Sequence, residues 1–120
     1  MSLSIDVETH LPVRTTLRLE GRLDTDTAHS FDEELERALD SPIKILVLDC
    51  AKLDYVSSAG ILSILKAQKR MNARGGKTLF GYLQPGVKKV FDIVKAVDLS
   101  SVFASVEELD EYLDSIQRDA

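Results

Sequence analysis

Two adjacent serines, Ser57 and Ser58, are the residues whose types and position most clearly allow chemistry. They follow the apolar run at residues 43–48 and precede an amphipathic pattern typical of a helix. The first N–H groups of a helix lack internal partners and carry the positive end of its dipole. A phosphate, either free or attached to a serine, would fit there. Helix capping is the commoner role of such serines, so the residues alone predict a helix N-terminus with an exposed hydroxyl.

A second polar segment, Asp-Thr-Asp-Thr at residues 24–27, follows an earlier predicted strand. Its simplest role is to cap the next helix. Loops that follow parallel strands gather at the carboxyl edge of the sheet, so this loop lies beside Ser57 and Ser58 if the two strands are parallel. Asp24 could then position a serine hydroxyl, and it would repel a phosphate on that serine.

The sequence does not match the motifs of a nucleotide-binding enzyme or of a serine hydrolase. Residues 75–78 (Gly-Gly-Lys-Thr) resemble the end of a phosphate-binding loop, but Met71 replaces its first glycine. The segment also leaves a helix and enters a strand, which is the reverse of that motif, so it predicts a helix C-terminal turn. His29 follows the polar loop, but no spacing demands a serine triad, and Ser58 lacks a nucleophile-elbow pattern. We expect no catalytic residues and no enzyme activity.

Composition indicates one globular domain covering residues 1–120. The chain has 120 residues, 44% of them hydrophobic, a net charge of −5 and a pI near 5.0. The acidic balance argues against nucleic-acid partners and against a basic membrane-surface helix. No apolar run is long enough for membrane insertion, and no signal peptide is visible, so the expected location is cytoplasmic. The lone Cys50 predicts a small buried residue, and we expect neither a metal site nor a cofactor.

Hydrophobic periodicity predicts the order β-β-α-β-α-β-α-β-α. The first two strands form a hairpin, and the apolar run at 43–48 predicts a central strand covered on both faces. Pro85 is expected to begin the third helix, and Ser105 to cap the last one. The predicted strands span 4–8, 13–20, 43–48, 78–82 and 102–103, and the predicted helices start near 28, 58, 85 and 105. Residues 21–27 are expected to form a turn and 117–120 a frayed tail. The fold class is α/β with a mostly parallel sheet of four to five strands.

These segments together resemble the STAS-domain family, whose simplest members are bacterial anti-sigma-factor antagonists (anti-anti-sigma factors). The resemblance covers nearly the whole chain and implies the STAS fold. Each matching piece is weak alone, but their order and spacing are specific. The pieces are Glu-Gly-Arg-Leu-Asp at 20–24 with Thr-Ala at 27–28, residues 45–49, Leu-Asp-Tyr-Val-Ser-Ser-Ala-Gly at 53–60, residues 75–77 and residues 87–91.

The resemblance implies that Ser58 is a phosphoacceptor, because the family's acceptor precedes a small residue and a glycine. The residue before it is often Asp in the best-known members, whereas Ser57 stands here as an alternative acceptor. Asp24 corresponds to the family acid near the phosphorylation site. Arg22 departs from the family pattern, which usually has Glu at this position.

The family's mechanism implies the partners of this chain. An unphosphorylated antagonist binds an anti-sigma factor that is also a serine kinase; phosphorylation weakens the complex, and a phosphatase resets it. The expected oligomeric state is a monomer or weak dimer. The expected partner contacts are Asp24, Thr25, Tyr55, Ser57 and Ile61, together with the exposed face of the helix after Ser58. The buried side of that helix is expected to hold Ile61, Leu62, Leu65 and Met71. One alternative is a constitutive STAS subunit docking on the ATPase of a lipid or solute transport system, and another is weak nucleotide binding.

Overall fold

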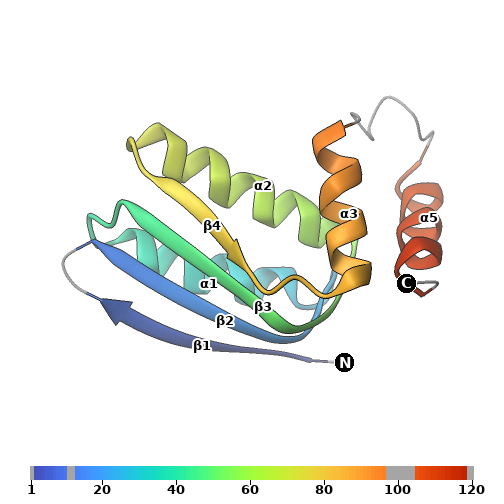
Figure 1. Ribbon diagram of the computed structural model, residues 1–120, viewed down its shortest axis with the longest axis horizontal. Coiled ribbons are helices and arrows are strands. Elements are labelled where there is room, and N and C mark those ends of the chain that lie inside the picture. Colours follow the sequence, from blue (N-terminus) through green and yellow to red (C-terminus); the bar gives the residue numbers. More distant parts are fainter. Residues whose placement is uncertain (1, 11–12, 97–104, 119–120) are drawn as a thin grey trace.

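Four strands form one mixed sheet in the order β1-β2-β3-β4 in the computed structural model, which describes residues 2–10, 13–96 and 105–118 (Figure 1). The strands are β1 (Leu3–His10), β2 (Arg14–Leu23), β3 (Ile45–Val56) and β4 (Lys77–Gly81). β1 pairs with β2 in antiparallel orientation, while the pairs β2–β3 and β3–β4 are parallel. The predicted hairpin and parallel sheet are confirmed.

Four helices are described: α1 (Ala28–Leu39), α2 (Ser58–Ala73), α3 (Pro85–Ala96) and α5 (Val106–Arg118). Pro85 begins α3 as predicted, since its fixed φ suits the first helical position. Gly75 follows α2 with φ of 75°, and β4 begins at Lys77, which confirms a helix C-terminal turn leading into a strand rather than a phosphate-binding loop. Ser105 caps α5 through the hydrogen bond from Glu108 N to its Oγ. The strand predicted at residues 102–103 lies outside the described residues.

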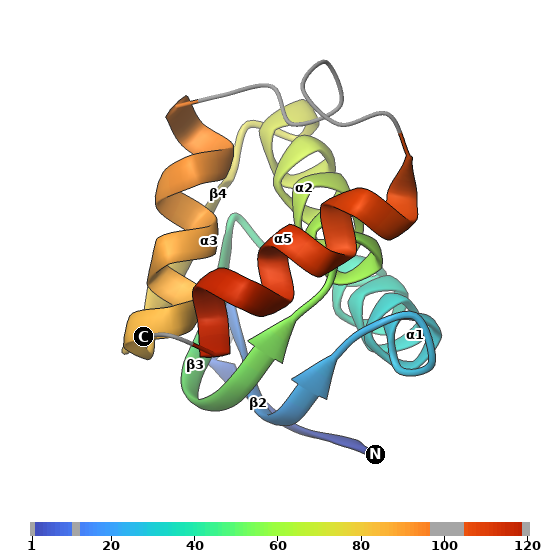
Figure 2. The ribbon, with the colours of Figure 1, turned by 90° about the vertical axis from the view of Figure 1, so that its right-hand side faces the viewer.

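Helices α1 and α2 lie together on one face of the sheet (Figures 1 and 2). Alternate residues of the central strands point toward them, so Leu17, Leu46 and Leu48 are fully buried. Phe31 and Leu35 of α1 are buried against the same core. Each such side chain contributes about 1.5–3 kcal/mol by leaving water, so this layer holds β2 and β3 in place.

The other face of β3 is only half-covered, so the prediction of cover on both faces is wrong. Val47 and Asp49 remain partly exposed there. Arg18 of β2 lies on this face, with its guanidinium 2.5 Å from Glu8 and 3.7 Å from Asp49. The apolar run at 43–48 arises because branched residues suit a strand even where one face meets polar neighbours.

Strands β2 and β3 both run further than predicted, to Leu23 and Val56. Their register shifts twice, between Arg18 and Glu20 and between Gly21 and Arg22. Such irregularities insert extra residues on one strand and break the simple alternation. Leu53 and Val56 are therefore both fully buried, although in a regular strand an odd-numbered and an even-numbered residue would point to opposite faces of the sheet. The predicted turn at 21–27 is wrong for residues 21–23, which belong to β2.

Cys50 is fully buried on β3, as expected for a small core residue. Burial, with a smaller contribution from Asp49, raises the pKa of its thiol to about 12. We therefore expect little reaction with a thiol reagent in the native protein between about pH 7 and 9, because the thiolate is the nucleophile. Labelling followed by mass spectrometry checks this, and reaction should become fast when urea unfolds the chain.

Since the native thiol keeps its proton longer than the unfolded one, this group's contribution to stability is lost as the pH rises from about 9 to 12. A matched control places an exposed thiol at the next position, with Ala51→Cys in a Cys50→Ala background. Equal native labelling of Cys50 and of the thiol at position 51 would contradict the burial of Cys50.

Candidate functional site

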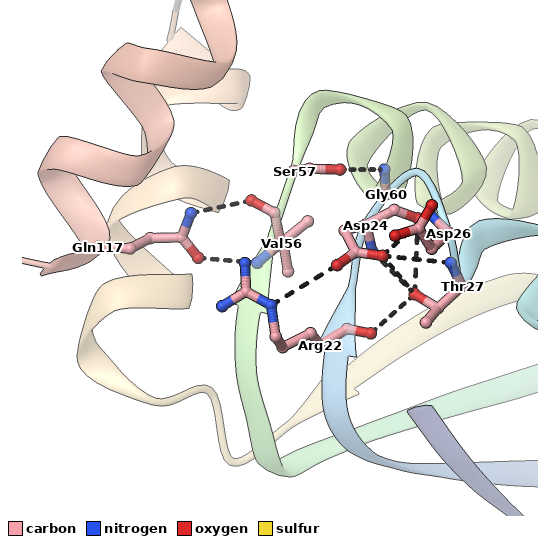
Figure 3. A network of polar contacts seen from close by, with 8 residues as sticks. All are labelled: Arg22, Asp24, Asp26, Thr27, Val56, Ser57, Gly60 and Gln117. Carbon is pink, nitrogen blue, oxygen red and sulfur yellow. Dashed lines mark hydrogen bonds and ion pairs between the residues drawn. The ribbon is translucent and has the colours of Figure 1, made fainter. Parts of the chain in front are cut away.

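Ser57 and Ser58 differ in role although they are adjacent. Helix α2 begins at Ser58, and Ser57 is its N-cap, with extended backbone angles of φ −90° and ψ 178°. The Ser57 Oγ accepts a hydrogen bond from Gly60 N at 3.3 Å (Figure 3). Ser57 therefore acts as the N-cap of α2. Within the described part of the chain, the Ser58 hydroxyl has no hydrogen-bond partner.

As whole residues both serines are largely buried, while the exposure of the Ser58 hydroxyl itself stays a prediction. Ser57 is 5% exposed and Ser58 is 7% exposed. The backbone N–H of Ser58 donates to Asp110 Oδ1 at 3.0 Å, which brings α5 onto the start of α2. Figure 2 shows α5 lying across the end of the sheet at which β2 and β3 finish. A carboxylate at this position is favoured by the helix dipole.

Gln117, near the C-terminus of α5, forms hydrogen bonds with the end of β3 (Figure 3). Its Oε1 accepts from Val56 N and its Nε2 donates to Val56 O, both at 2.8 Å. β4 pairs with β3 only as far as Asp49, so the amide of Gln117 satisfies backbone groups that lack a neighbouring strand. The prediction of a frayed tail is therefore wrong for Gln117, which belongs to α5.

The polar loop at residues 24–27 lies beside the serines, as the parallel topology predicts. Ser57 N donates to Leu23 O at 2.9 Å, which joins the two chain segments. Asp24 Oδ1 accepts from the N–H groups of Asp26 and Thr27 at 3.0 and 3.2 Å. The Thr27 Oγ1 accepts from Asp24 N and donates to Arg22 O. The Asp24 carboxylate thus shapes this loop and brings a negative charge next to the serines.

A cation lies among carboxylates at this end of the sheet. The Arg22 guanidinium stacks over the Tyr55 ring at 3.9 Å, and its Nε is 3.6 Å from Asp24 Oδ2, too far for a hydrogen bond. Burial raises the pKa of Tyr55, helped by the carboxylates of Asp114, Asp110 and Asp24 and opposed by Arg22. Arg22 thus partly offsets the negative charge that the loop and α5 bring together.

The other expected contact residues fall on different surfaces. Thr25 is exposed at the loop, and Tyr55 is half-buried beneath Arg22. Ile61 is 7% exposed and packs in the core, as predicted for the buried side of α2, so it offers little surface to a partner. Leu62 and Leu65 were predicted on that buried side but are 65% and 40% exposed, because α2 is rotated so that they face away from the sheet.

Sequence reasoning missed Asp110 and Gln117. They lie about two helical turns apart, so they share one face of α5. That spacing is a visible signal for a polar face, but nothing local indicates what the face contacts.

The described residues carry no catalytic constellation. The His29 side chain is 85% exposed, with its Nε2 3.4 Å from Glu33, so it faces solvent rather than Ser58. No group of three or more His, Cys, Asp or Glu side chains in the described ranges could hold a metal ion. In the same ranges, every helix is too short or too polar to cross a bilayer.

Fold and site together define a small α/β domain that carries a serine at a helix N-terminus, with a polar loop beside it. The chain belongs to the STAS domain family, whose profile matches residues 4–109. BtrV of Bordetella bronchiseptica, assigned by its name to the anti-sigma factor antagonists, is 33% identical over 75 residues, which are 62% of this chain and 65% of BtrV. The match thus spans slightly less than two thirds of BtrV.

A second relative matches more of its length. The anti-sigma F factor antagonist of Paenibacillus polymyxa is 29% identical over 94 residues, which are 78% of this chain and 80% of that protein. Among solved structures, unphosphorylated SpoIIAA has a TM-score of 0.64 at 20% identity and covers 74% of this chain and 82% of its own. An anti-sigma factor antagonist from Mycobacterium paratuberculosis has a TM-score of 0.68 at 17% identity, covering 97% and 95%. The two structures show the same fold.

Proposed function

We propose that this protein is an anti-sigma-factor antagonist that binds an anti-sigma-factor serine kinase and is released when Ser58 is phosphorylated. The names of the two sequence relatives support the general role. The position of Ser58 supports the site, since the Ser57 oxygen is occupied as a cap while the Ser58 hydroxyl is unpaired within the described chain. This difference between the two serines is the observation that carries the choice of acceptor.

The chemistry proposed at Ser58 is a phosphoryl transfer from ATP. The Ser58 Oγ attacks the γ-phosphorus of ATP and loses its proton to a base of the kinase, and ADP leaves. The product carries about −1.5 to −2 charges at neutral pH. The N-terminus of α2 tolerates this charge, so the fold is expected to survive. A partner surface that fits a neutral hydroxyl does not tolerate the added charge, so the complex dissociates. A phosphatase would restore the hydroxyl by hydrolysing the phosphate.

The proposed contact surface surrounds the start of α2. Thr25 and Leu62 are exposed and offer side chains to a partner, while Asp24 and Tyr55 are partly buried. Ser57 is engaged within the chain, since its hydroxyl accepts from Gly60 N and its backbone groups bond to Leu23 O and Ile61 N. An aliphatic side chain beside hydroxyl and carboxylate groups is typical of a contact surface with an apolar centre and a polar rim.

Intact-mass measurement with site mapping tests this function on protein purified from its native host. We expect one added phosphate in the wild type and none in Ser58→Ala. Ser57→Ala is the matched control and should keep the phosphate, although loss of the cap costs it about 1 kcal/mol of stability.

Loss of the phosphate only in Ser57→Ala would move the acceptor to Ser57. No phosphate under any growth condition would contradict the switch and favour constitutive docking on a transport ATPase.

A further inference from the structure

A carboxylate of helix α5 lies at the start of α2, where a helix N-terminus would otherwise attract an anion. The Asp110 carboxylate accepts the Ser58 N–H at 3.0 Å, where an unmodified helix N-terminus attracts negative charge. Ser58 is at the same time 7% exposed. A kinase must bring the Ser58 hydroxyl into line with ATP, and a helix docked beside a residue with so little exposed surface leaves little room for that approach.

We propose that docking of α5 and phosphorylation of Ser58 exclude each other, with Asp110 as the residue that couples them. This rests on the proposed function. α5 must leave the start of α2 before Ser58 can react. A phosphate on Ser58 then keeps α5 away, because its oxygens compete for the same N–H groups and its charge repels the Asp110 carboxylate.

Most of the charges near Tyr55, at the end of the sheet that α5 covers, are negative. Asp114 lies on α5 close enough to Tyr55 to act on it electrostatically, as do Asp110 and Asp24. Arg22 opposes them but is already near Asp24 and Tyr55. A phosphate on Ser58 would face the Asp110 carboxylate directly, at an end of the sheet that already holds three carboxylates and one cation, so the docked arrangement becomes unfavourable.

The contacts that hold α5 are few enough to break locally. Leu113 is its one fully buried side chain among the described residues, while Leu109 and Ile116 are only partly buried. Its polar attachments to the rest of the domain include the bond of Asp110 to Ser58 N and the two bonds of Gln117 to Val56. β3, in contrast, pairs with β2 along its length and also with β4 from Ile45 to Asp49. Such a terminal helix can open while the sheet stays folded.

The first test needs no kinase, because phosphoserine is installed at position 58 during protein synthesis. Hydrogen exchange is then measured for residues 106–118. We expect their amides to exchange about 3- to 30-fold faster than in the unmodified protein, the range for loss of one helix cap. Phosphoserine at position 30, on the exposed surface of α1, is the control and should leave α5 protected.

Equal protection of α5 with phosphate at either position would overturn the proposal. Equal acceleration of the β3 amides would also overturn it, because the opening would then be global.

The second test removes the coupling charge from the unmodified chain. Asp110→Asn should speed exchange of the Ser58 amide and of α5, whereas Asp114→Asn on the same helix should not. Equal exchange in the two variants would overturn the role of Asp110. Because neither test depends on cellular phosphorylation, their failure is distinct from a failure of the proposed function, which the mass measurement on native protein decides.

Discussion

Phosphorylation of Ser58 is expected to weaken binding to the anti-sigma-factor kinase by about 30-fold to several thousand-fold. This corresponds to about 2–5 kcal/mol, the cost of an unpaired charge buried in an interface. The site offers little compensation, because the Asp24 carboxylate is turned into its own loop and the Arg22 guanidinium stacks on Tyr55. A partner that covers the start of α2 would therefore bury the phosphate without a compensating positive charge from this chain.

Isothermal titration of the kinase with the two forms of the protein, in the absence of ATP, measures this difference. Phosphoserine at position 30 adds the same charge on α1 and is expected to change the affinity by less than about threefold. Similar losses with phosphate at positions 30 and 58 would show a net-charge effect and contradict a contact surface at the start of α2. Unchanged affinity with phosphate at position 58 would remove the basis of the switch.

Gly60→Ala is expected to destabilise the domain by about 2–4 kcal/mol, through overpacking and a weakened cap. A Cβ at Gly60 would lie 2.5 Å from the carbonyl oxygen of Leu23 and 2.9 Å from its Cγ. The carbonyl cannot move away freely, because it accepts the hydrogen bond from Ser57 N. The Gly60 N–H also donates to the Ser57 cap, so a shift of α2 disturbs the serine site directly.

Urea unfolding monitored by circular dichroism measures the loss of stability. Gly81→Ala is the matched control, since no atom lies within 4 Å of the Cβ it would add. That variant is expected to stay within about 0.5 kcal/mol of the wild type or to gain slightly through the unfolded state. Equal stability of the two variants would show that α2 does not approach β2 as closely as described.

The start of α2 was predictable because the signals for it are local. A strand-forming run leads to two serines and then to an amphipathic pattern, and capping acts over three residues. The proximity of the Asp24 loop also followed, since parallel strands bring their carboxyl ends to the same edge.

The ends of β2 and β3 were missed for a physical reason. Two register shifts between these strands break the alternation on which strand prediction depends. Leu53 and Val56 re-enter the core only because the paired strand allows the shift. The same limit applies to Ile61 and Leu62, whose burial depends on how α2 is rotated against the sheet.

The sequence by itself determined the order of strands and helices, the parallel sheet and the two serines at the head of a helix. Those features follow from periodicity and capping, which act between near neighbours. The tertiary structure decided that α5 packs at the end of β3 and the start of α2, because Asp110 and Gln117 bond to residues 52 and 61 positions away in the chain. Neither partner shows a local preference for the other, so such contacts arise only once α5 docks across the end of the sheet.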